Sequence, residues 1–132
     1  MAKTFSNMAA LGSIAPPFRL PEPGGKIHSL EDFASSKALV VMFLCNHCPF
    51  VKHIRAGIAQ IARDYHPKGI AFIAISANDP IHYPEDSPEK MIEEKRQAGY
   101  SFPYLFDEDQ TVARAYQAAC TPDFFLYDSN RE

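Results

Sequence analysis

The segment Cys45-Asn46-His47-Cys48 has the spacing of a dithiol that can close into a small disulfide ring. It follows an apolar run over residues 39–44 and precedes a helix-like pattern that begins at Pro49. The free N–H groups and the positive dipole end of a helix start favour thiolate over thiol. The sequence therefore predicts thiol–disulfide exchange, in which Cys45 is the exposed attacking thiol with a lowered pKa and Cys48 resolves the mixed disulfide.

His47 directly precedes the second cysteine. An imidazole at this position stabilises the neighbouring thiolate and makes the disulfide more oxidising. The alternative interpretation is a solvent-exposed loop histidine. Cys120, far along the chain, is either a third thiol that pairs with Cys45 or with another molecule, or a small buried residue.

Metal binding is the non-enzymatic alternative for these residues. Two-coordinate copper(I) suits a CxxC pair. Zinc normally takes four ligands, and beyond the CxxC pair the chain offers His47, His53 or Cys120 but no second ligand pair. A CxxC copper-binding module is thus the third function considered, and we expect neither a resident metal nor a cofactor.

The elements that position the dithiol follow from the hydrophobic pattern. The runs over 39–44 and 70–75 lack polar alternation, as expected of strands buried on both faces. Between them, apolar residues recur at helical spacing and predict one helix with one buried stripe. The stripe comprises Phe50, Ile54, Ile58, Ile61 and Tyr65. Further helices are predicted over 87–99 and 110–119, and further strands over 102–106 and 124–127. The alternation of strands and helices predicts an α/β fold with parallel neighbouring strands.

The N-terminal part has a different character. Residues 1–15 are expected to form a loose lead-in, and extended pieces around 18–20 and 26–28 flank a Pro-Gly-Gly turn that predicts a β-hairpin. Residues 1–12 lack the basic start and apolar core of a signal peptide.

Composition narrows the class of protein. The chain has 132 residues, of which 46% are hydrophobic and 22% charged, and this fits one soluble domain over 1–132. A formal net charge of −3 argues against a nucleic-acid or anionic-membrane partner, and no apolar run approaches a membrane span. Three cysteines indicate reactive thiols in a reducing compartment, so we expect a cytoplasmic protein.

Four segments together resemble the thioredoxin superfamily, and within it the redoxin branch of alkyl-hydroperoxide-reductase and thiol-specific-antioxidant (AhpC/TSA) proteins. They are residues 12–20 (GSIAPPFRL), 29–33 (SLEDF), 39–48 with the CxxC, and 121–126 (TPDFFL). The resemblance implies a central mixed β-sheet flanked by helices, with an N-terminal β-hairpin extension. It also implies that Thr121-Pro122 is a cis peptide facing the dithiol, where the backbone before the proline can pair with an extended substrate. A final strand and helix of the usual fold are missing from the chain, and a homodimer would cover the exposed sheet edge.

The resemblance favours an antioxidant-type thiol–disulfide oxidoreductase with protein or small-molecule thiol or disulfide substrates and an unidentified reductant. A peroxiredoxin-like thiol peroxidase is the alternative. Peroxiredoxins present the attacking cysteine as Pro-x-x-x-Thr-x-x-Cys. Counted back from Cys45 those positions hold Ala38 and Met42, and counted back from Cys48 they hold Val41 and Cys45. The peroxidase therefore ranks second.

Overall fold

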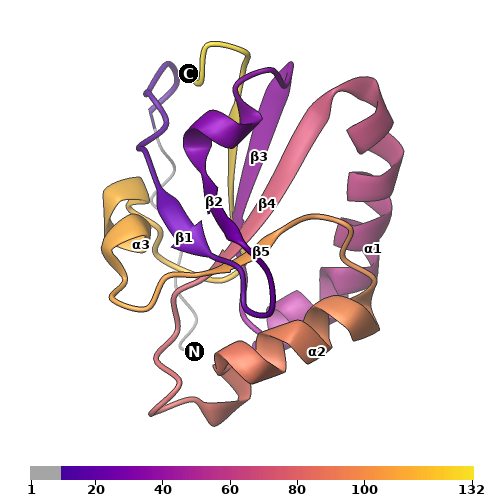
Figure 1. Cartoon of the computed structure of the whole chain (residues 1–132), viewed down its shortest axis with the longest axis vertical. Coiled ribbons are helices and arrows are strands. Elements are labelled where there is room, and N and C mark those ends of the chain that lie inside the picture. Colours follow the sequence, from indigo (N-terminus) through magenta and orange to yellow (C-terminus); the bar gives the residue numbers. More distant parts are fainter. Residues whose placement is uncertain (1–9) are drawn as a thin grey trace.

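A four-stranded sheet with the order β5-β4-β3-β6 forms the centre of the computed structural model, which describes residues 10–132 (Figure 1). The strands are β3 (Ala38–Phe43), β4 (Ile70–Ser76), β5 (Tyr104–Phe106) and β6 (Asp123–Tyr127). β3, β4 and β5 run parallel, and β6 runs antiparallel to β3. The sheet is therefore mixed, as the resemblance implied, and parallel pairing holds for every predicted strand of the sheet except the last.

Helices cover both faces of this sheet. They are α1 (Pro49–Tyr65), α2 (Pro88–Ala98) and α3 (Thr111–Tyr116), with 3₁₀ turns at Leu30–Phe33, His66–Lys68 and Pro84–Asp86. Alternate residues of β3 point to opposite faces. Met42 packs in the cluster beneath α1 and α2, and Phe43 packs against Tyr116 of α3. Figure 1 shows α1 and α3 on opposite sides of the sheet.

The predicted hairpin is present as β1 (Arg19–Pro21) and β2 (Ile27–Ser29), paired antiparallel. Gly24 adopts a φ of 75° in the turn, a conformation that favours glycine. The carboxylate of Glu22 accepts hydrogen bonds from the Tyr104 backbone N–H and from Lys95 Nζ, each at 2.7 Å. These contacts attach the hairpin to β5 and α2.

The buried face of α1 differs from the predicted stripe. Val51, Ala59 and Ala62 are buried together with Ile58, whereas Phe50, Ile61 and Tyr65 are exposed. The helix has two apolar faces, and the smaller residues lie on the face that packs closely on the sheet. No helix within residues 10–132 is long and apolar enough to cross a membrane.

The second apolar face of α1 borders the edge strand β6. Ile61 and Tyr65 line a hollow of about 330 Å³ together with Phe124 and Leu126, whose exposed fractions are 48% and 72%. Of the predicted lead-in over 1–15, residues 1–9 lie outside the described part. Ala15 is buried and its N–H donates to the Arg131 carbonyl at 2.8 Å, so the end of the lead-in is anchored rather than loose.

Candidate active site at the CxxC turn

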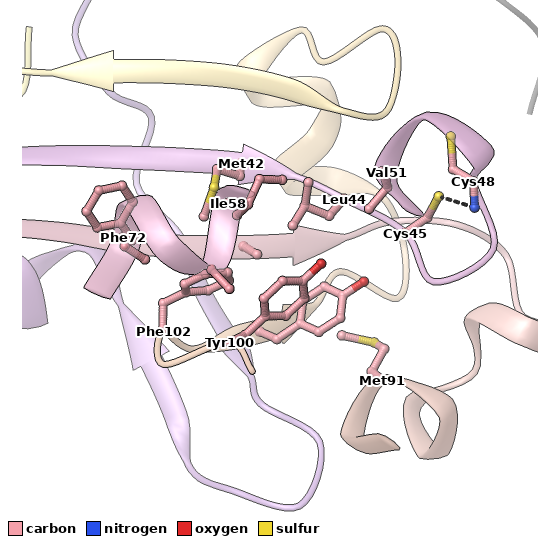
Figure 2. Close-up of a cluster of buried hydrophobic side chains, with 14 of the residues drawn as sticks. Met42, Leu44, Cys45, Cys48, Val51, Ile58, Phe72, Met91, Tyr100 and Phe102 are labelled. Carbon is pink, nitrogen blue, oxygen red and sulfur yellow. Dashed lines mark hydrogen bonds between the residues drawn. The ribbon is translucent and has the colours of Figure 1, made fainter. Parts of the chain in front are cut away.

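The dithiol lies in the short link between β3 and α1. Cys48 is the N-cap residue of α1 and Pro49 occupies its first turn. The Cys48 backbone N–H donates to Cys45 Sγ at 3.2 Å, the contact drawn dashed in Figure 2. Figure 2 also shows that both cysteines lie at one end of the hydrophobic cluster beneath α1. Their exposed fractions are 0% for Cys45 and 1% for Cys48.

Thr121 contacts both sulfur atoms. Its Oγ1 lies 3.4 Å from Cys45 Sγ, and its carbonyl oxygen accepts a hydrogen bond from Cys48 Sγ at 3.4 Å. The antiparallel pairing of β6 with β3 places Asp123 opposite Phe43 and so brings Thr121 to the end of β3. The Thr121-Pro122 peptide is cis, as predicted. The structure thus brings Cys45, Cys48, Thr121 and Pro122 together from segments more than 70 residues apart.

The electrostatics of the two thiols are the reverse of the sequence prediction. Burial raises the pKa of Cys45 to about 12, and the nearby Asp86 carboxylate acts in the same direction. Burial also opposes ionisation of Cys48, but the nearby backbone at Val51 and Phe50 and the side chains of Thr121 and Cys45 outweigh it and lower the pKa of Cys48. The prediction of an exposed Cys45 with a lowered pKa is therefore wrong, because Cys45 is buried near Asp86 and it is Cys48 that lies at the helix N-cap.

Asp86 is the residue of this site that sequence reasoning missed. It is fully buried, and its Oδ1 accepts the backbone N–H groups of Asn46 at 2.7 Å and His47 at 3.2 Å. Its Oδ2 accepts from His47 Nδ1 and from Asn78 Nδ2, the latter at 2.8 Å. The loop that carries Asp86 leaves the carboxyl end of β4, parallel to β3, so it starts at the same sheet edge as the CxxC link. The parallel order of these two strands was the feature of the sequence that could have pointed to Asp86.

The side chains between the two cysteines are held by the same loop. The His47 side chain is only 13% exposed, and its ring stacks on Tyr83 with centroids 5.0 Å apart, so the alternative of a solvent-exposed histidine is wrong. Asn46 donates to the Glu85 carbonyl at 2.8 Å and accepts from Tyr104 Oη at 2.9 Å. These bonds fix the conformation of the CxxC turn.

Three side chains of the site carry possible metal ligands. Within residues 10–132, Cys45, His47 and Asp86 each offer one ligand atom, and these atoms lie within 4.8 Å of one another. Both oxygens of Asp86 already accept two hydrogen bonds each. A cation would have to displace those donors, so these residues do not fit a resident metal.

Cys120 directly precedes Thr121, but its sulfur hydrogen-bonds to a backbone carbonyl. It donates to the Pro122 carbonyl at 3.4 Å and borders a hollow of about 230 Å³ with Phe43 and Gln110. Burial raises the pKa of Cys120, and Asp123 adds to the effect. Its role as a third thiol stays a prediction.

Comparisons with known proteins place this dithiol in a family. The model of the AhpC/TSA family matches residues 11–132. The chain belongs to this family. It is 28% identical to the thiol–disulfide oxidoreductase ResA of Geobacillus kaustophilus over 98% of this chain and 70% of ResA.

Two solved structures support the fold of this AhpC/TSA chain. The crystal structure of a hypothetical protein from Sinorhizobium meliloti 1021 matches with a TM-score of 0.96 and 50% identity, over 98% of this chain and 70% of that protein. The thioredoxin domain of a thiol–disulfide oxidoreductase from Bacteroides vulgatus matches with a TM-score of 0.79 and 17% identity, over 95% and 86% of the two chains. The fold is thioredoxin-like.

Proposed function

We propose that this AhpC/TSA protein is a thiol–disulfide oxidoreductase that cycles between the Cys45/Cys48 dithiol and its disulfide. The observation that carries the proposal is that Thr121 contacts the sulfurs of both Cys45 and Cys48, which lie next to the start of α1. In each cycle the dithiol reduces a substrate disulfide to two thiols and becomes an intramolecular disulfide, and an external dithiol restores it. The name of the relative ResA supports this reaction class.

Protein or small-molecule disulfides are the proposed substrates. The backbone carbonyl of Thr121 lies beside the Cys48 sulfur, where an extended segment can approach. His47 and Asp86 hold the turn, and the substrate supplies the sulfur that is attacked.

Insulin reduction by dithiothreitol tests the proposal. We expect the protein to accelerate insulin precipitation, and we expect Cys45→Ser and Cys48→Ser to return the rate to that of dithiothreitol alone. Cys120→Ser is the matched control and should keep the acceleration. Absence of acceleration by the native chain, with fast consumption of hydrogen peroxide by its reduced form, would favour a peroxidase instead.

We also propose a homodimer that covers the β6 edge and a reducing, cytoplasmic location. Exposed Phe124 and Leu126 on an edge strand support the dimer, and the odd number of cysteines supports the location. We expect sedimentation analysis to give a dimer that Leu126→Lys converts to a monomer, while Ile81→Lys, which alters an exposed loop residue, leaves it unchanged. A monomeric native chain would contradict this.

A further inference from the structure

The two sulfurs of the CxxC turn have opposite electrostatic surroundings. Cys48 caps a helix of 17 residues whose first turn contains no acidic residue. Burial opposes ionisation of its thiol, but the backbone at Val51 and Phe50 in that turn contributes to a lowered pKa of Cys48. The helix-start N–H groups and the dipole therefore act on a negative charge at Cys48 without an opposing carboxylate in that turn.

Cys45 lies outside the helix and beside a buried carboxylate. Its sulfur lies within 4.8 Å of a ligand atom of both His47 and Asp86, and it is fully buried. It accepts one backbone N–H, that of Cys48. A negative charge on Cys45 would be desolvated and would lie close to a second negative charge, which disfavours the thiolate.

We propose that Cys48 is the thiol that attacks the substrate and that Cys45 resolves the mixed disulfide, which is the reverse of the order that the sequence suggests. The inference rests on the proposed exchange function. Cys48 thiolate attacks one sulfur of the substrate disulfide, forms the Cys48–substrate bond and expels the other substrate thiolate. Cys45 then loses its proton, attacks Cys48 Sγ and releases the second substrate thiolate. Two electrons pass from the dithiol to the substrate.

His47 is the acceptor assigned to the proton that Cys45 loses, because a nitrogen of its ring lies within 4.8 Å of the Cys45 sulfur. Its Nδ1–H donates to Asp86, which fixes the tautomer and leaves Nε2 as the accepting nitrogen of the neutral ring. Nε2 is buried and has no hydrogen-bond partner in the described part of the chain. The other charged groups near Cys45 are Asp86 and the Cys48 thiolate, and Thr121 contributes a hydroxyl.

Single-cysteine variants in a Cys120→Ser background test the order of attack. With 5,5′-dithiobis(2-nitrobenzoic acid) at pH 7, we expect Cys45→Ser, which keeps Cys48, to form its mixed disulfide at least about tenfold faster than Cys48→Ser, because one pKa unit changes the thiolate fraction about tenfold. Intact mass should show the adduct retained on Cys48. A faster reaction of Cys48→Ser, or equal rates, would overturn the inference.

A second measurement uses the native chain. Iodoacetamide labelling of reduced protein, mapped by peptide mass, should modify Cys48 before Cys45, and the opposite order would count against the proposal. His47→Gln should leave the first attack unchanged and slow release of the second thiolate, a split that a merely structural role would not produce. The exchange function itself is judged separately: it fails if the native chain does not accelerate insulin reduction, whichever thiol reacts first.

Discussion

Asp86→Ala is expected to lower the free energy of unfolding by about 4 kcal/mol. The substitution removes a fully buried carboxylate that accepts four hydrogen bonds. The N–H groups of Asn46 and His47 and the amide of Asn78 would lose their acceptor inside the protein. Each buried donor without a partner costs about 1–3 kcal/mol, and partial relaxation keeps the total below the sum. Urea unfolding followed by circular dichroism measures the change.

Glu85→Ala is the matched control for this prediction. Glu85 precedes Asp86 in the same 3₁₀ turn, and the contact it makes with Asn46 uses its backbone carbonyl, which alanine retains. We expect that variant to unfold within about 0.5 kcal/mol of the native chain. The free energy of unfolding of Asp86→Asn should lie between those of Asp86→Ala and Glu85→Ala, because the asparagine keeps one accepting oxygen while its NH₂ group faces donors. If Asp86→Ala unfolded like Glu85→Ala, the carboxylate would not be what holds the CxxC turn.

The dithiol and its cis-proline partner were predictable because each is encoded by a short continuous segment of the sequence. The apolar run of β3 and Pro49 at the helix start place Cys45 and Cys48 between a strand and a helix, and the resemblance pairs Thr121-Pro122 with them. Asp86 was not predictable in the same way. Its partners at Asn46 and His47 lie 40 and 39 residues away, and only the folded loop brings them together.

The position of the N-cap could have been read from Pro49. A proline in the first helical position makes the preceding residue the N-cap, so the positive end of the helix dipole lies at Cys48 rather than at Cys45. Burial of Cys45 could not be read locally, because Thr121 and the loop with Asp86 supply it. In the same way, helical spacing identified α1 but not which of its two apolar faces packs on the sheet.

The reduced protein is expected to lose stability above pH 9, with Cys45 as one identifiable source. The pKa of Cys45 is raised from 9.0 to about 12 by burial, so its folded form keeps a proton that the unfolded chain releases. This stabilisation is complete below pH 9 and is lost as the pH rises toward 12. Burial also raises the pKa values of Tyr100, Tyr104 and Tyr116, which act in the same direction at still higher pH. Cys48 acts in the opposite direction. Its lowered pKa stabilises the folded protein at pH values above the pKa that Cys48 has in the unfolded chain, and that stabilisation is lost as the pH falls.

Comparison of the native chain with Cys45→Ser isolates the Cys45 contribution, since the tyrosines and Cys48 are common to both. One retained proton changes the free energy of unfolding by about 1.4 kcal/mol per pH unit. Urea midpoints measured between pH 8 and 11 under a non-thiol reductant should therefore fall more steeply for the native chain than for Cys45→Ser. Cys48→Ser should keep the steep fall above pH 9 that the native chain shows. Parallel curves for the native chain and Cys45→Ser would mean that Cys45 ionises as readily in the folded protein as in the unfolded one, and the buried carboxylate beside it would then have no role in choosing the attacking thiol.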